Sequence, residues 1–436
     1  MEFHYRETSG ISSSAVDAAK PLLGPYIDSL RTVRGKGGYE APESSINLPY
    51  DEALLDTCVS IVEEKKIHSV KYIFLIGIGG SNLGVRALYD ALYGGVDQLD
   101  PHRFPKMFFL DTVSGVDVSA YETLLKEIKH RDEVLIIVVS KSGTTVETIA
   151  HTEHLLDQLS SHGEDIFSRV VMITDEGSPL WKDATEKSII TLPIPAPVGG
   201  RYSVFSSVGI FPLLCAGVDV DEFRAGAQRA VENGLYDGES NHALITALAL
   251  FENTKKGKTI HNSFFFTPRL ESLGKWYRQL LGESIGKTHN EAGEVVHAGI
   301  TPIISIGSVD LHSVGQLYVG GPQDKFTTFV RVADAPSGVT PSVPKDTIFN
   351  TVQGIAGKSF DHIMGAILTG VVETYRKKEL PFITVGLEKI DAGTLGEFMQ
   401  YQMITMMFLG KLFNVNPFDQ PDVESYKNET RMLLGA

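Results

Sequence analysis

The chain has 436 residues, of which 42% are hydrophobic and 21% are charged, and it contains 42 glycines. This composition is typical of a folded α/β enzyme with a substantial core, and it excludes disordered and fibrous proteins. The formal net charge of −15 argues against nucleic acid or an anionic membrane as a partner, because both attract basic surfaces.

Several features indicate a cytoplasmic location and no bound metal. Met1–Arg6 lack the cationic start and the apolar stretch of a signal peptide. The longest uncharged segment, Tyr202–Val218, contains Pro212 and falls short of a membrane span. Cys58 and Cys215 are too few for a disulfide framework, and no cluster of cysteines and histidines has zinc-ligand spacing. We therefore expect a reducing compartment, no metal and no membrane contact.

The first half of the chain predicts one α/β domain. Residues 1–66 are expected to be an irregular lead-in that ends in a helix over Asp51–Lys66, where apolar residues recur at helical spacing. From 67 to 198, apolar runs alternate with helical segments such as Val146–Leu159, which is typical of a parallel sheet covered on both faces. The expected strands are Tyr72–Ile76, Met107–Leu110, Val134–Val139, Val170–Ile173 and Ile189–Leu192.

The second half predicts another α/β domain over 199–390 and a helical tail over 391–436. Prolines and glycines over 193–200 mark the junction. The tail includes an expected helix over Thr394–Phe413. Two α/β domains in tandem imply a cleft between them, with ligands at the carboxyl ends of the strands. Other expected elements are helices at Asp221–Gly234, His242–Lys255 and Asp361–Lys377, and strands at Lys258–Phe266, Thr301–Ile306 and Lys325–Val332.

Two loops in the first domain have the composition of a phosphate site. Gly77–Gly84 connects the strand Tyr72–Ile76 to a helix and contains four glycines. Glycines allow a tight turn, and the free N–H groups at a helix start attract an anion. The pattern recurs after Val134–Val139, where Ser140–Thr145 supplies four hydroxyl groups and the ammonium of Lys141. We expect the two loops to bind one phosphate.

A dinucleotide-binding fold is the alternative interpretation of the first loop. Its fingerprint needs a glycine at the sixth position, where this chain has Asn82, and an acidic residue about twenty positions further on. Asp111 follows Gly77 by more than thirty positions. The second loop, with its many hydroxyl groups, also suits a compact phosphate better than a dinucleotide.

Six motifs, taken in order, resemble those of the glucose-6-phosphate isomerase family. They are Gly77–Ser81, Ser140–Thr145, Gly199–Ser203, Gly282–Ser284, Asp310–His312, and Phe418–Gln420 together with Lys427. The resemblance extends over nearly the whole chain. It implies two sugar-isomerase domains, each a parallel sheet flanked by helices, and a homodimer. It also implies interconversion of glucose 6-phosphate and fructose 6-phosphate without a cofactor, a reaction of glycolysis and gluconeogenesis.

The resemblance gives each candidate residue a role. Glu283 is the base that moves a proton between C2 and C1, and Arg201 stabilises the intermediate enediolate, as suits a fixed positive charge. His312, expected from the neighbouring subunit, opens the sugar ring together with Lys427. Gln279 is expected to bind sugar hydroxyls, and Gln420 is expected to contact the sugar phosphate. The residues expected at the phosphate are Gly80, Ser81, Ser140, Lys141, Ser142 and Thr145.

Taken alone, several of these residues have simpler interpretations. Glu283 could be a solvated glutamate at a helix end, and Arg201 could form a salt bridge at the domain junction. A single histidine is more often structural, and a lysine near the end of a chain is usually solvated. The flanking motifs favour the catalytic roles.

Four features depart from the usual pattern of the family. Extra residues around Thr288–Gly299 precede His312, and their polar composition predicts a surface loop. Asp422 stands where glycine is usual, and its carboxylate would repel a phosphate unless it points outward. Ala196 replaces a polar residue, and Ile285 replaces an acidic one. These changes bear on substrate affinity and specificity.

Two other functions are compatible with the same domains. One is an isomerase of a different sugar phosphate, such as mannose phosphate or an amino sugar. The other is a sugar-phosphate sensor without catalytic activity. A sensor would be expected to lack Glu283 or Arg201 and to carry a DNA-binding appendage. The sequence shows neither of these two signs of a sensor.

Overall fold

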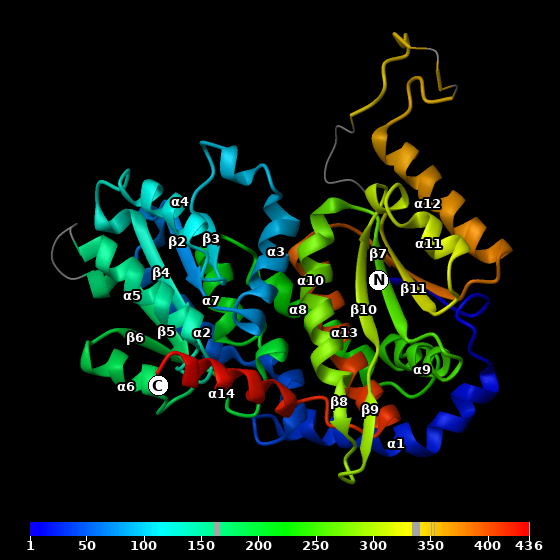
Figure 1. Cartoon of the computed structure of the whole chain (residues 1–436), viewed down its shortest axis with the longest axis horizontal. Coiled ribbons are helices and arrows are strands. Elements are labelled where there is room, and N and C mark those ends of the chain that lie inside the picture. Colours follow the sequence, from blue (N-terminus) through cyan, green and yellow to red (C-terminus); the bar gives the residue numbers. More distant parts are fainter. Residues whose placement is uncertain (161–165, 334–340, 350, 353, 436) are drawn as a thin grey trace.

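Two largely parallel β-sheets lie side by side, with long helices packed between and around them (Figure 1). The structure is a computed structural model that describes residues 1–160, 166–333, 341–349, 351–352 and 354–435. The architecture confirms the predicted α/β class, with a sheet flanked by helices in each half of the chain.

The first sheet contains five parallel strands in the order β3-β2-β4-β5-β6. Successive side chains of β2 and β4 enter two different hydrophobic clusters, so both faces of the sheet are buried. This is the reason that the strands are continuous apolar runs. The strands are β2 (Tyr72–Ile76), β3 (Lys106–Leu110), β4 (Val134–Val139), β5 (Val170–Thr174) and β6 (Ile190–Pro193). The connecting helices are α3 (Leu83–Tyr93), α4 (Gly115–Leu125), α5 (Val146–Ser160) and α6 (Pro179–Glu186).

The second sheet has the order β1-β12-β11-β7-β10. Its strands are parallel except β1, which pairs antiparallel with β12 and brings the start of the chain into this sheet. The strands are β1 (Glu2–His4), β7 (Ile260–Phe265), β10 (Thr301–Ile306), β11 (Lys325–Val332) and β12 (Phe382–Leu387). The sequence predicted β7, β10 and β11 but neither β1 nor β12.

The helices between the sheets form the centre of the molecule. Helix α13 is buried along most of its length and packs against α8, α9 and α10. Apolar side chains of these helices join the inner faces of both sheets in one continuous cluster. The central helices are α7 (Ser207–Cys215), α8 (Val220–Gly234), α9 (His242–Lys255), α10 (Glu271–Ile285) and α13 (Ala392–Phe413).

Two segments differ from the sequence-based expectation. The expected irregular lead-in contains the 24-residue helix α1 (Ser13–Lys36), which packs against α9 and α13, before α2 (Glu52–Glu64). The segment around Thr288–Gly299 is at the surface, but the prediction of a loop was wrong. It forms an antiparallel hairpin of β8 (Lys287–His289) and β9 (Val295–Ala298).

The remaining helices lie at the outside of the molecule. Helices α11 (Gly315–Gly320) and α12 (Phe360–Lys377) cover the outer face of the second sheet, and α14 (Glu424–Leu433) ends the described chain near the first sheet (Figure 1). Among the helices of the described residues, none combines the length and the apolar character that crossing a membrane requires.

His261, near the start of β7 in the second sheet, is a fully buried histidine. Its Nδ1 lies 2.8 Å from the Tyr277 hydroxyl, and its Nε2 lies 2.8 Å from the Thr328 hydroxyl. Burial lowers the pKa of His261 to about 3, from an ordinary value of 6.5. The unfolded chain therefore binds a proton here as the pH falls below 6.5, whereas the folded chain does not until about pH 3.

We predict that this histidine makes the protein less stable as the pH falls from 6.5 towards 4. The free energy of unfolding should lose up to about 1.4 kcal/mol per pH unit through this one site. Urea unfolding at several pH values measures how the free energy of unfolding depends on pH. The slope of this dependence should be shallower for His261→Gln than for wild type, whatever the stability of the variant at pH 7. The matched control, His68→Gln at an exposed histidine, should keep the wild-type slope. Equal slopes in all three proteins would contradict the prediction.

Candidate active site

Two loops come together where neighbouring strands of the first sheet end. β2 pairs with β4 in parallel, so the segments that follow them leave the same edge of the sheet. The first continues as the short helix η3 (Gly79–Ser81) into α3, and the second continues as Ser140–Thr145 into α5. A Cβ at Gly77 would lie 2.9 Å from the Val139 carbonyl oxygen, so the two loops begin in contact. Ser81 is half-buried at the end of η3.

The hydroxyl groups of the second loop hold its shape. The Ser140 hydroxyl lies 2.8 Å from that of Thr145 and accepts a hydrogen bond of 3.2 Å from the Gly143 N–H. The Ser142 hydroxyl accepts one of 3.3 Å from the Thr144 N–H. The loop is thus ordered before a ligand binds, and its hydroxyl groups can exchange partners with a phosphate.

Lys141 connects the second loop to the segment that leads to Arg201. Its ammonium donates hydrogen bonds of 2.6 Å to the Ala196 carbonyl and 2.9 Å to the Val198 carbonyl. Burial lowers the pKa of Lys141. The two acceptors of its ammonium are carbonyl oxygens and not carboxylates. Because Ala196 contributes its backbone, the unusual side chain at this position does not affect the contact.

The first glycine loop lies against the backbone that carries Arg201. A Cβ at Gly80 would overlap the carbonyl group of Gly200 and would lie 2.6 Å from the Arg201 nitrogen. The helices η3 and η7 (Gly200–Tyr202) therefore pack backbone to backbone. Glycine at position 80 is what permits this approach.

Arg201 is 2% exposed, and its guanidinium ties together three segments of the chain. Nε donates a hydrogen bond of 2.9 Å to the Ser284 hydroxyl on α10. Nη2 donates to the carbonyls of Pro417 at 2.6 Å and Asp419 at 2.9 Å. A buried charge with such partners is held in one position.

The remaining guanidinium nitrogen of Arg201, Nη1, faces the predicted base. It lies 2.7 Å from Gln420 Oε1 and 3.5 Å from Glu283 Oε2. Gln279, one helical turn before Glu283, donates a hydrogen bond of 3.2 Å to Glu283 Oε1. The Glu283 side chain is 36% exposed, so the carboxylate is oriented on one side and accessible on the other.

The Gln279 side chain also reaches the first glycine loop. A Cβ at Gly79 would lie 2.9 Å from Gln279 Nε2. Gln279 Oε1 is buried and has no hydrogen-bond partner among the residues that the structure describes. This oxygen is an available acceptor for a hydroxyl group between the loop and α10.

His312 and Lys427 do not belong to the described hydrogen-bond network around Arg201. His312 follows the short helix η9 (Val309–Leu311), beyond the edge strand β10, and is exposed. Lys427 lies on α14 and forms an ion pair of 2.6 Å with Glu424, with its side chain 38% exposed.

Sequence reasoning missed Lys287, which lies at the same site. Its ammonium donates a hydrogen bond of 2.8 Å to the Glu283 carbonyl and lies 3.1 Å from Asp419 Oδ1. Burial lowers the pKa of Lys287, while the nearby carboxylate of Asp419 opposes that shift. A lysine four positions after the base, directly after the end of α10, is the signal that could have identified it.

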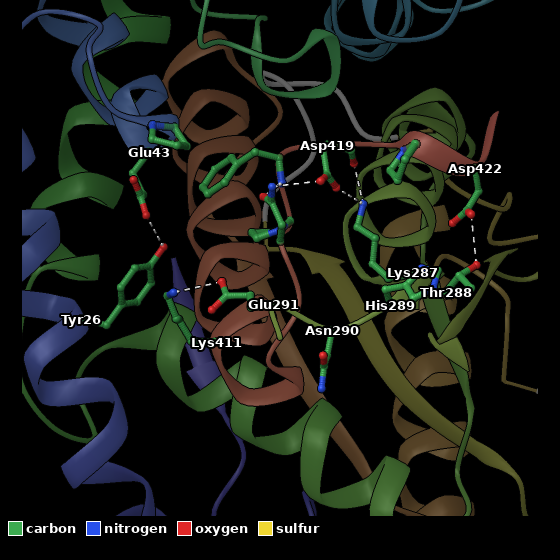
Figure 2. A pocket seen from close by; sticks show the side chains of 15 residues that line it. Tyr26, Glu43, Lys287, Thr288, His289, Asn290, Glu291, Lys411, Asp419 and Asp422 are labelled. Carbon is green, nitrogen blue, oxygen red and sulfur yellow. Dashed lines mark hydrogen bonds and ion pairs between the residues drawn. The ribbon is translucent and has the colours of Figure 1, made fainter. Parts of the chain in front are cut away.

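The unusual Asp422 points to the β8–β9 hairpin. Asp422 Oδ1 accepts a hydrogen bond of 3.0 Å from the Thr288 hydroxyl, at the rim of a pocket of ≈470 Å³ (Figure 2). Ile285, where an acidic residue is usual, is fully buried in the central cluster. Neither departure places an additional carboxylate beside the base. Within the described ranges, no group of three or more His, Cys, Asp or Glu side chains is arranged to hold a metal ion.

The geometry can bind an anion and move a proton next to it. Two adjoining loops carry N–H and hydroxyl donors, and Gln279 links the first of them to a carboxylate that faces a guanidinium. A fixed positive charge beside a base stabilises negative charge on an oxygen of the ligand.

Comparisons with known proteins agree with this arrangement. A family model described as phosphoglucose isomerase matches residues 62–434. A glucose-6-phosphate isomerase from Campylobacter jejuni is 30% identical over 401 residues, covering 92% of each protein. One from Rubrobacter xylanophilus is 31% identical over 450 residues, covering 100% of this chain and 98% of that protein.

Two solved structures share the fold. A hypothetical protein from Thermus thermophilus has a TM-score of 0.87 and 30% identity, and the match covers 100% of both chains. A glucose-6-phosphate isomerase from Chlamydia trachomatis has a TM-score of 0.81 at 19% identity, covering 98% of this chain and 86% of that one.

We predict that Gly80→Ala disrupts the contact between η3 and η7. The added methyl group meets backbone atoms that cannot rotate away, so unfolding should become easier by about 1 to 3 kcal/mol. Gly95→Ala is the matched control, because a Cβ there has no atom within 4 Å, and its stability should change by less than about 0.5 kcal/mol. Urea unfolding of the three proteins checks the prediction, which fails if the two variants are equally stable.

Proposed function

The chain belongs to the phosphoglucose isomerase family, and we propose that it catalyses the reversible conversion of glucose 6-phosphate to fructose 6-phosphate. The observation that carries the proposal is the carboxylate of Glu283, which lies 3.5 Å from the buried guanidinium of Arg201 and is linked through Gln279 to the first glycine loop. Relatives named glucose-6-phosphate isomerase support the same aldose–ketose isomerisation. The reaction belongs to glycolysis and gluconeogenesis.

The two loops bind the phosphate of the substrate. The N–H groups at the start of α3 and the hydroxyl groups of Ser81, Ser140, Ser142 and Thr145 donate hydrogen bonds to it. Gly80 lets the backbone approach the phosphate. The ammonium of Lys141 already donates to two carbonyls, so it contributes mainly a positive potential. A local positive field of this kind is what an anionic substrate needs in a chain of net charge −15.

Glu283 transfers the proton. Its carboxylate removes the proton from C2 of the open aldose, and the electrons form a cis-enediolate. The hydroxyl proton of O2 passes to O1, and the proton held by Glu283 returns to C1 to give the ketose. Arg201 stabilises the enediolate oxygens through Nη1, because its other nitrogens are bonded to Ser284 and to two backbone carbonyls. Gln279 offers its buried Oε1 to a sugar hydroxyl, and Gln420 contacts the sugar phosphate.

His312 and Lys427 open the sugar ring before the proton transfer. Ring opening moves a proton from the C1 hydroxyl to the ring oxygen, and a histidine can exchange protons near neutral pH. We propose that His312 acts in the site of a second copy of the chain, in a homodimer. This agrees with its exposure at the edge of the second sheet.

The surface around His312 supports a dimer. Val309, Leu317 and Phe360 are apolar and are 63%, 47% and 57% exposed. Helix α12 buries only Tyr375, although an apolar groove runs between it and α11. Exposed apolar surface of this extent is typical of an interface between protein chains.

We also propose the domain limits expected from the sequence, and a cytoplasmic location. The first sheet lies within 67–198, and four strands of the second lie within 199–390, before the helical tail at 391–436. Strand β1, in the lead-in 1–66, is attached to the second domain. The cysteines Cys58 and Cys215 are buried and free, as suits a reducing compartment.

We predict that the purified protein converts fructose 6-phosphate to glucose 6-phosphate and that Glu283→Gln abolishes most of this activity. Loss of the base should lower kcat by about 100- to 10,000-fold, with a smaller change in KM because the phosphate loops are intact. Coupling to glucose-6-phosphate dehydrogenase measures the product. Glu271→Gln, at an exposed glutamate on the same helix, is the matched control. A folded wild-type protein without turnover would point to another sugar phosphate or to a sensor.

We predict that subunits inactive through Glu283→Gln and through His312→Ala complement each other. In a mixed dimer one site has both substitutions and the other has none, so random pairing should restore about one quarter of wild-type activity. Co-expression of the two variants with different tags, followed by activity measurement, checks this. Each variant co-expressed with itself is the control. Mixed dimers without activity would argue against a shared site.

A further inference from the structure

The segment between α13 and α14 carries Gln420 but has little regular structure of its own. It contains the single-turn helix η10 (Pro421–Val423) and depends on side chains of other elements for its position. Figure 2 shows side chains of this kind from the β8–β9 hairpin, which follows α10. The position of this segment decides where Gln420 meets Arg201.

Lys287 is a buried link between this segment and the last turn of α10. Its side chain is 4% exposed. The ammonium donates to the Glu283 carbonyl at 2.8 Å and to the Asp419 carbonyl, and it lies 3.1 Å from Asp419 Oδ1. A lysine has three N–H donors, and these three acceptors use them all. Lys287 thus connects the last turn of α10 to the residue next to Gln420.

The hairpin makes further contacts with this part of the chain, some before Gln420 and one after it. Before it, the Glu291 N–H donates a hydrogen bond of 2.8 Å to the Asn414 carbonyl, and the Glu291 carboxylate pairs with Lys411 at 3.2 Å. After it, the Thr288 hydroxyl donates to Asp422 at 3.0 Å. These contacts are partly exposed and individually weak, whereas the Lys287 contacts are buried.

The arrangement matters because Arg201 Nη1 is shared between Gln420 and Glu283, at 2.7 Å and 3.5 Å. A shift of Gln420 or of the last turn of α10 would change both distances. On the basis of the proposed isomerase function, we propose that Lys287 is a positioning residue. Together with the hairpin that continues from it, Lys287 holds Gln420 and Glu283 at their distances from Arg201 Nη1. It does so without touching the reacting atoms.

Lys287→Met tests the proposal, because methionine keeps a long apolar stem and removes the ammonium. The kcat for fructose 6-phosphate should fall by about 10- to 100-fold, the effect of losing hydrogen bonds from a charged donor, while KM changes by less than about threefold. Backbone amides of 414–423 should exchange with deuterium faster than in wild type, and those of the two phosphate loops should not. Lys275→Met is the matched control, because Lys275 lies on the preceding helix α10 in an exposed pair with Glu271; it should behave like wild type.

A second variant applies if Lys287→Met does not fold. Asp419→Asn removes one charged acceptor of Lys287 at a half-exposed side chain and should lower kcat at least about threefold with the melting temperature retained. Where both variants fold, the loss in the double variant should be smaller than the product of the single losses, because both act on one contact. The proposal is overturned if Lys287→Met folds and keeps the wild-type kcat and deuterium exchange. If only Asp419→Asn folds, an unchanged kcat in that variant overturns it. An inactive wild-type protein would instead count against the isomerase function itself.

Discussion

The buried guanidinium of Arg201 is the interaction on which the site depends. It connects the segment after Gly199–Gly200, the end of α10 and the start of the C-terminal segment, three parts of the chain that are far apart in sequence. A charge can be buried in this way only if its donors are satisfied, and two of the acceptors here are backbone carbonyls that cannot move independently. The same bonds that make burial tolerable also set the direction of Nη1 towards Glu283.

The hydrogen-bond acceptors of the lysine side chains fix where the positive charges of the site lie. Lys141 and Lys287 donate to backbone carbonyls, and both have pKa values lowered by burial. Their ammonium groups hold loops in place, and their charge adds to the positive field at the proposed substrate site. In a chain of net charge −15, this local concentration of cations and helix N-termini separates the site from its acidic surroundings.

The β8–β9 hairpin shows how an added segment can be accommodated at a site. Its strands are short and mostly exposed, so it adds little to the core. It nevertheless contacts the chain on both sides of Gln420 and donates a hydrogen bond to the carboxylate of Asp422. The hairpin and Asp422 are thus paired in the structure, although the sequence presents them as two unrelated departures.

The sequence alone determined the strands of the first sheet, three of the five strands of the second, and several of the long helices. Strands such as Val134–Val139 are buried on both faces, so their residues are continuously apolar and easy to recognise. It also predicted the two loops rich in glycine and hydroxyl groups and the type of residue at each proposed catalytic position. Tertiary structure decided what local pattern could not.

Helix α1 contains Pro21 and Pro25, which locally argue against a helix, yet Leu23, Ile27 and Leu30 are buried by packing that the sequence does not show. The role of Lys287 depends on a carbonyl more than a hundred residues away. Periodicity and motifs report on neighbours along the chain, whereas such contacts exist only once distant segments have met.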